Sequence, residues 1–118
     1  MKFFINTLLF LLIFLPFKAQ PLSQTVRDTC AVPTIFTPND DGVNDQLVIP
    51  CVTPNDKTND SELYILTEWG EQILHARPYK NEWPGDYKGK PLPDGTYFYI
   101  FILHPSLPAQ RGYVTIFR

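Results

Sequence analysis

The chain has 118 residues, 44% of them hydrophobic and 19% charged, with a formal net charge of −2 at pH 7. This length suits a single domain with one hydrophobic core. The mildly acidic balance, without basic runs, provides no electrostatic attraction for nucleic acid or anionic lipid and argues against both classes of partner.

Residues 1–19 have the pattern of a secretory signal peptide. Lys2 provides a short positive region, residues 3–17 are mostly apolar, and Ala19 offers a cleavage point. The uninterrupted apolar run at 8–17 is about half of the roughly 20 residues that a membrane-spanning helix needs, so we expect export and cleavage. Cleavage removes two lysines and no acid, which leaves 8 basic and 12 acidic residues and a net charge of about −4.

Residues 20–29 are polar and are interpreted as a short linker. From residue 30 onward, short apolar runs alternate with Pro, Gly, Asn and Asp at intervals of about ten residues, and no stretch has helical periodicity. We therefore predict one all-β domain over 30–118, an immunoglobulin-like antiparallel β-sandwich of about six to seven strands. The expected strands are 32–36, 46–49, 62–67, 72–76, 95–103 and 112–117.

Cys30 and Cys51 are the only cysteines. An even number in a chain expected to be exported predicts a disulfide, worth about 3 kcal/mol in the chain-entropy model. Two free, buried thiols are the alternative, because pairing geometry cannot be read from sequence. A zinc site would need more ligands than these cysteines and the distant His75 and His104 supply.

The most locally specific stretch is the polar turn at residues 37–45. If Gly42 takes the sixth position of an EF-hand-like loop, Asn39, Asp41 and Asp45 fall on ligand positions and become candidate calcium ligands. A true EF-hand is excluded, because a valine stands where the bidentate Glu belongs. The alternative is a self-bonded turn, whose Asn and Asp side chains accept hydrogen bonds from the turn's own amides.

Two further segments predict how the sheet is covered. Residues 68–71 indicate a hairpin turn, and we expect Trp69 to fold back into the core because a buried Trp contributes a large apolar area. A ligand platform is the alternative for Trp69. The strand expected at 95–103 is apolar on both faces, which predicts burial of both or, as the alternative, an apolar patch for a partner.

A loop rich in aromatic residues precedes that strand. Tyr79, Trp83 and Tyr87 are candidates for stacking on the sugar rings of a glycan, because a loop with Pro and Gly can hold them in place. The same rings can instead close the open end of a sandwich, which is the commoner outcome.

Five segments of the sequence, taken in order, carry a family resemblance. Residues 36–45 read Phe-Thr-Pro-Asn-Asp-Asp-Gly-Val-Asn-Asp, followed by Trp-Gly at 69–70, by segments at 81–85 and 89–99, and by the last seven residues. Together they resemble the gliding-motility-associated C-terminal domain of Bacteroidetes, which is the type B sorting domain of the type IX secretion system. The resemblance covers nearly all of the expected mature chain.

This resemblance implies a secretion-targeting and surface-interaction module without covalent chemistry. It implies the type IX outer-membrane translocon and a dedicated outer-membrane protein as partners, and a location at the cell surface or outside the cell. Because little sequence precedes the domain, we expect a nearly bare sorting domain without a passenger, associated with gliding or adhesion. The residues expected to be recognised by the translocon or partner are Gly112, Tyr113, Val114, Thr115, Ile116, Phe117 and Arg118.

The sequence also bears on two other classes of function, a binding module and an enzyme. A small secreted carbohydrate-binding or adhesive β-sandwich module is the alternative, and it would rest on the loop aromatics. An enzyme is not expected, because the two histidines lie 29 residues apart and no Ser or Cys falls in a nucleophile motif. No cofactor is certain from the sequence, and calcium is the one metal that it suggests.

Overall fold

A computed structural model of the protein describes residues 30–118, which contain seven strands and no helix. The signal peptide expected at 1–19 and the linker expected at 20–29 lie outside the described residues. Within 30–118, no helix is long and apolar enough to cross a membrane. The strands are β1 (Ile35–Phe36), β2 (Glu62–Leu66), β3 (Gln72–Ala76), β4 (Asp86–Tyr87), β5 (Lys90–Pro91), β6 (Gly95–Ile102) and β7 (Gln110–Ile116).

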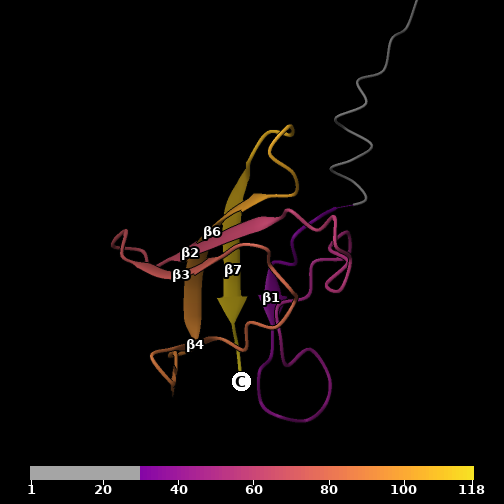
Figure 1. Ribbon diagram of the computed structural model, residues 1–118. Helices are drawn as coiled ribbons and strands as arrows, with labels where there is room; N and C mark the ends of the chain where they lie inside the picture. Colours follow the sequence, from indigo (N-terminus) through magenta and orange to yellow (C-terminus); the bar gives the residue numbers. More distant parts are fainter. Residues whose placement is uncertain (1–29) are drawn as a thin grey trace, which may run out of the picture.

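Five of the strands form one sheet in the order β1-β7-β6-β2-β3, and β4 and β5 form a separate two-stranded hairpin (Figure 1). β6 and β7 make the longest ladder, from the Gly95–Ile116 pair to the Phe101–Gln110 pair. Pairing is antiparallel throughout the large sheet except between β1 and β7, which run parallel. The prediction of an all-β fold with six to seven strands is confirmed, and the parallel pair is a departure from it.

One face of the five-stranded sheet carries the hydrophobic core. On β6, Tyr97 and Phe101 point to this face and are buried, whereas Phe98 points to the opposite face and is 44% exposed. Side chains alternate because successive residues of a strand point to opposite faces. The fully buried aliphatic residues of the core are Leu47, Ile49, Leu63, Ile65, Val114 and Ile116.

The strand predicted at 46–49 does not form, although Leu47 and Ile49 are completely buried. The Leu47 amide donates to the carbonyl of Trp83 at 3.0 Å, and the Ile49 amide donates to the Asn81 side chain at 2.9 Å. The alternation of apolar residues therefore predicted burial correctly. The strand assignment was wrong because a loop, rather than a neighbouring strand, satisfies the backbone of this segment.

Of the remaining strand predictions, 72–76 is confirmed as β3 with the same ends, and the others are confirmed with changed ends. The strand expected at 32–36 shortens to β1, and the last strand begins two residues earlier, at Gln110. The β4–β5 hairpin was missed, because its short polar strands lack the alternating pattern by which a strand is predicted from sequence.

The predicted disulfide between Cys30 and Cys51 is present, with the two Cα atoms 4.9 Å apart. Cys30 is 1% exposed and belongs to the core. The bond joins the beginning of the described chain to the end of the buried segment that contains Leu47 and Ile49. It therefore closes the loop that holds β1 and the polar turn at 37–45.

Trp69 does not fold back into the core, and that prediction was wrong. Its side chain is 85% exposed. The backbone forms a tight turn, in which the Gly70 amide donates to the Thr67 carbonyl at 2.9 Å and Gly70 has φ of +88°. This turn projects from the end of β2 and β3 (Figure 1), where the ring remains in solvent.

Two substitutions on β6 test which sheet face is the core. Phe101→Ala should lower the free energy of unfolding by about 3–5 kcal/mol, since it leaves a cavity among fully buried side chains. Phe98→Ala, three residues earlier on the opposite face, is the control and should cost about 1 kcal/mol. Urea denaturation measures both, and equal losses would contradict the one-sided core.

Candidate functional site

The seven residues predicted for partner recognition lie on β7 and just beyond it, and the structure divides them by face. Val114 and Ile116 are completely buried, whereas Tyr113 is 53% exposed and Phe117 is 59% exposed. Thr115 is half-buried on the same outward face as Tyr113. Deletion of the whole segment would therefore remove part of the core together with any binding surface.

Gly112 has a packing role opposite Tyr99, its partner in the β6–β7 ladder. A Cβ atom at this position would lie 2.7 Å from the Tyr99 hydroxyl oxygen and 2.9 Å from the ring carbon that carries it. These separations are too short for real atoms, so the glycine leaves room for the ring. Gly112 is thus needed for packing within the sheet.

Arg118 is held by the loop that precedes β6. Its guanidinium donates to the carbonyl oxygens of Leu92 and, at 3.2 Å, Gly85, and it lies 3.4 Å from the Asp94 carboxylate. The Arg118 amide also donates to Asp94, at 3.2 Å. Arg118 was predicted to take part in partner recognition, and these contacts were not predicted, since only the fold brings residues 85, 92 and 94 to the end of β7.

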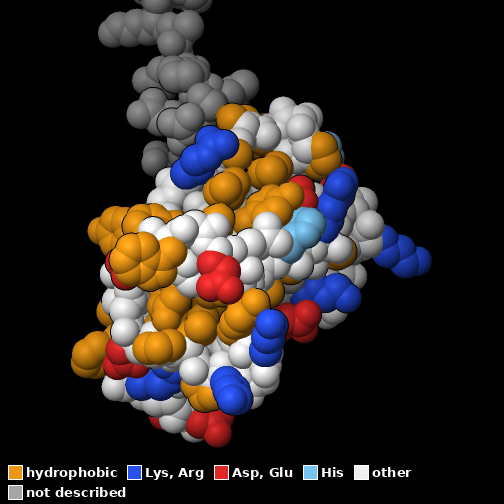
Figure 2. Space-filling model, turned by 90° about the vertical axis from the view of Figure 1, so that its left-hand side faces the viewer, with side chains coloured by type: hydrophobic (Ala, Val, Ile, Leu, Met, Phe, Trp, Pro, Cys, Tyr) orange, Lys and Arg blue, Asp and Glu red, His pale blue; other side chains and the backbone are white. Residues whose placement is uncertain are grey.

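The outward face of the sheet carries an apolar surface around β7 and β6. Figure 2 looks onto the molecule from the side where the β2–β3 turn projects and shows hydrophobic side chains spread across this view. Burial of both faces of β6 was the favoured prediction, and the exposure of Phe98 supports the alternative, an apolar patch. A groove of about 500 Å³ on this surface is lined in part by Leu66, Glu68, Phe98, Ile100, Arg111 and Tyr113.

The other end of this outward face is covered by a polar cluster on β2 and β3. The rings of Tyr64 and His75 stack with centroids 4.3 Å apart and an angle of 5° between their planes. The Glu62 carboxylate contacts His75 Nε2 at 2.6 Å and accepts a hydrogen bond from the Tyr64 hydroxyl at 2.8 Å. The hydrogen bond from His75 and then that from Tyr64 lower the pKa of Glu62.

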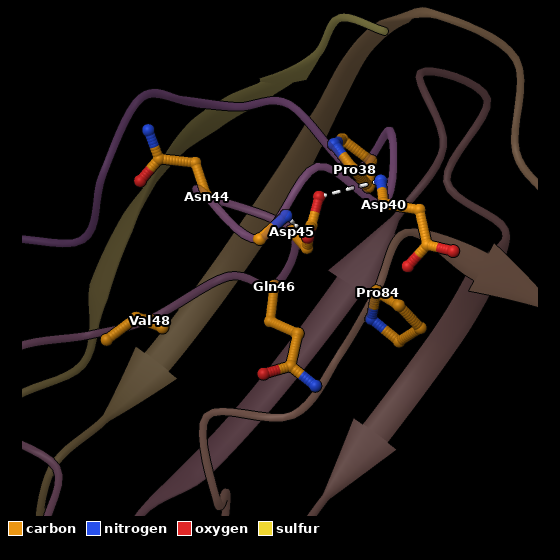
Figure 3. Close-up of a pocket in the computed structure, with 8 residues that line it drawn as sticks. Pro38, Asp40, Asn44, Asp45, Gln46, Val48 and Pro84 are labelled. Atoms are coloured by element: carbon orange, nitrogen blue, oxygen red, sulfur yellow. Dashed lines mark hydrogen bonds between the residues drawn. The ribbon is translucent and has the colours of Figure 1, made fainter.

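The polar turn at 37–45 is bonded to itself. The Asp45 carboxylate accepts hydrogen bonds from the amides of Asn39 at 3.2 Å, Asp40 at 2.8 Å and Gly42 at 2.7 Å. Asn39 and Asp41 each accept from the amide two residues further along the chain. Figure 3 shows the Asp45 contact with the Asp40 amide beside a pocket of about 600 Å³.

This geometry matches the self-bonded turn that was the alternative to a calcium site. Calcium takes six to eight oxygen ligands, whereas both oxygens of Asp45 already accept hydrogen bonds from amides. Among residues 30–118, no three His, Cys, Asp or Glu side chains gather in a way that could hold a metal ion. The three candidate ligands therefore come together as acceptors for the turn's own backbone.

The three aromatics predicted as a glycan platform do not present open ring faces. Tyr79 is 1% exposed and Trp83 is 3% exposed, and both belong to the core. Tyr87 is half-buried, and the Lys88 ammonium lies 5.2 Å from the centre of its ring. Because stacking on sugar requires a free face, this platform is corrected: Tyr79 and Trp83 close the end of the core, which was the alternative.

Comparison with known protein families covers almost all of the described residues. The family model described as CHU_C type IX secretion signal domain matches residues 30–116. This range contains all seven strands of the described structure and the disulfide. No curated protein and no solved structure matches the chain significantly.

The Glu62 cluster predicts a pH dependence of stability. Because the pKa of Glu62 is lower in the folded protein than in the unfolded chain, its stabilising effect is complete above the ordinary pKa of about 4.3 and is lost as the pH falls through the lowered value. Glu62→Gln should therefore flatten the acid side of the curve of unfolding free energy against pH. Urea denaturation between pH 3 and pH 6 measures this, with Glu71→Gln on the neighbouring turn as control, and an unchanged slope in Glu62→Gln would contradict it.

The polar turn predicts unequal effects of its acids. Asp45→Ala should accelerate amide hydrogen exchange at residues 40 and 42, because both amides lose their acceptor, and should have less effect at Asn39, whose amide also donates to the Thr37 carbonyl at 2.8 Å. Asp41→Ala removes a single acceptor, for the Val43 amide, and is the control. If calcium instead stabilises the turn, added calcium chloride will raise the melting temperature of the unaltered protein and not that of Asp45→Ala.

Proposed function

We propose that the chain is delivered by presenting the outward face of β7 to the secretion apparatus. The ground for this proposal is that the chain belongs to the family of type IX secretion signal domains. Membership of this family makes the chain a secretion-targeting module and implies export to the cell surface or the extracellular space. Inner-membrane passage directed by residues 1–19, and a surface role in gliding or adhesion, are parts of the same proposal.

The observation that supports β7 as the recognised element is the exposure of its aromatic side chains. Tyr113 and Phe117 stand in solvent at the end of the domain, next to Phe98 and Ile35, which are 44% and 53% exposed. Large apolar side chains exposed together on one sheet face are typical of a protein-binding surface, and aromatics contribute most of the binding energy at such surfaces.

The buried face of β7 sets a condition on this recognition. Val114 and Ile116 pack into the core, and the Phe117 amide donates to the Phe36 carbonyl at 3.2 Å. Tyr113 and Phe117 therefore take their places only when β7 is paired with β6 and β1. We infer that the partner binds the folded domain rather than an extended C-terminal peptide.

The proposed partners are the type IX outer-membrane translocon and a dedicated outer-membrane protein. Binding rests mainly on contact between apolar surfaces, and no step of it makes or breaks a covalent bond. The groove lined by Phe98, Ile100 and Tyr113 would receive an apolar side chain of the partner, with Glu68 and Arg111 placed to pair with charges at its border.

Substitution of the exposed aromatics tests this function. The double variant Tyr113→Ala and Phe117→Ala should remain in the periplasm, because it loses the outward surface while the core stays intact. Trp69→Ala, which removes an even more exposed aromatic away from β7, is the control and should reach the surface. Protease accessibility on intact cells, with and without the translocon, measures delivery.

Thermal unfolding of each variant separates failed recognition from failed folding. Surface delivery of the double variant at the level of the unaltered chain would reject β7 as the recognised element. Delivery in cells that lack the translocon would reject the secretion route itself.

A further inference from the structure

Among the large hydrophobic residues of the described structure, Trp69 is the most exposed, at 85%. Its ring contributes nothing to the core, and the proposed docking surface on β7 does not use it. A Trp is costly to leave in water, since it carries one of the largest apolar areas of any side chain. The ring therefore needs another explanation.

The turn that carries Trp69 is rigid. The Thr67 amide donates to the Glu71 carbonyl at 2.9 Å, and the Gly70 amide donates to the Thr67 carbonyl at 2.9 Å. The Thr67 hydroxyl oxygen accepts from the amides of Trp69 at 3.3 Å and Glu71 at 3.1 Å. Four hydrogen bonds within five residues hold the backbone of Trp69 in place, although its side chain stands in solvent.

A second rigid wall faces this turn, formed by residues 92–95. The Tyr97 hydroxyl donates to the Pro93 carbonyl at 2.8 Å, and the Arg118 amide donates to the Asp94 carboxylate at 3.2 Å. The Arg118 guanidinium also donates to the Leu92 carbonyl. Both walls are thus fixed by hydrogen bonds before any ligand arrives, which lowers the entropic cost of binding.

Between the two walls lies a groove of about 550 Å³, within the size range of small-ligand sites. Its lining is mixed. Trp69, Leu92 and Pro93 offer apolar contact, whereas Glu68, Asp94 and Thr96 offer oxygen atoms. This combination differs from the mainly apolar groove beside Tyr113.

We propose that this groove binds a neutral oligosaccharide. The face of an aromatic ring carries negative charge density and attracts the weakly positive C–H groups on one face of a pyranose. Carboxylate oxygens at the border accept hydrogen bonds from sugar hydroxyls and fix the orientation of the ring. The lining carries the carboxylates of Glu68 and Asp94, and the cation at its edge, the Arg118 guanidinium, is already bound to Asp94 and to the Leu92 carbonyl. An acidic or sulfated polysaccharide would therefore meet the charge of Glu68 without an unpaired cation to offset it, which disfavours such ligands.

This binding activity uses a groove other than the proposed docking groove, although Thr67 and Glu68 border both. Trp69 lies on the β2–β3 turn, and the residues proposed for translocon recognition lie on β7 and just after it. A surface-delivered domain that binds neutral glycans would act as an adhesive module after export.

The test titrates the full chain with cellohexaose and chitohexaose as neutral probes and with the hexamer of galacturonic acid as the anionic probe. Tryptophan emission is the readout, because Trp69 is exposed whereas Trp83 is 3% exposed and reports little. A neutral hexamer should shift the emission to shorter wavelength with saturation below about 5 mM, and the anionic hexamer should not.

Variants assign the binding to the groove. Trp69→Ala, followed by saturation-transfer NMR of the probe, should bind at least about tenfold more weakly, and Trp69→Phe should fall between the two because it keeps an aromatic face. Tyr113→Ala is the matched control and should bind as the unaltered chain does. Absence of binding by both neutral hexamers, or equal binding by Trp69→Ala, would overturn the proposal.

Secretion of the same variants separates this proposal from the targeting function. If Trp69→Ala fails both to bind sugar and to reach the surface while remaining folded, the ring belongs to a protein-docking surface and the glycan proposal is wrong. If Tyr113→Ala with Phe117→Ala is delivered normally but Trp69→Ala loses sugar binding, the targeting proposal fails and the glycan proposal stands.

Discussion

The described fold depends on hydrogen bonds between two segments that are not strands. Leu47 and Ile49 are completely buried, yet their amides find partners only in the loop that contains Tyr79, Asn81 and Trp83. The Tyr79 hydroxyl donates to the Leu47 carbonyl, and burial raises the pKa of this phenol. Without these contacts, buried backbone groups would lose hydrogen bonds, at a cost of about 1–3 kcal/mol each. They allow irregular chain to serve as the second layer opposite the five-stranded sheet.

Each motif shared with the sorting-domain family spans only a few residues, because single residues within the motif make the contacts that hold the core together. The side-chain oxygen of Asn81, which has φ of +58°, accepts a hydrogen bond from the Ile49 amide. A turn residue thus holds the buried segment that contains Leu47 and Ile49 in place. Trp83 packs 5.6 Å from the ring of Phe36 and donates from its indole nitrogen to the Asp86 carbonyl. Packing and hydrogen bonding therefore account for Asn81 and Trp83. In β7, the inward side chains belong to the core, and only the outward side chains are free for a partner.

Two surfaces with different chemistry meet at the turn between β2 and β3. Leu66 and Gly70 border the apolar groove beside Tyr113, Trp69 borders the mixed groove, and Thr67 and Glu68 border both. A protein partner and a glycan would thus engage different aromatic residues but share the backbone of this turn.

The sequence by itself determined the all-β class, most strand positions and the family, because alternating apolar residues and turn residues act locally. It predicted the disulfide from the cysteine count, and the fold decided the pairing by placing the two Cα atoms 4.9 Å apart. The apolar residues Leu47 and Ile49 predicted burial. The sequence pattern could not tell whether a neighbouring strand or a loop would accept the backbone hydrogen bonds of this segment. The tertiary structure alone decided which aromatics face water: Trp83 is buried and Trp69 exposed, although both sit in turns with a glycine close by. It also placed Arg118 against Asp94 and Gly85. These outcomes depend on contacts between residues far apart in the chain, and no local pattern encodes them.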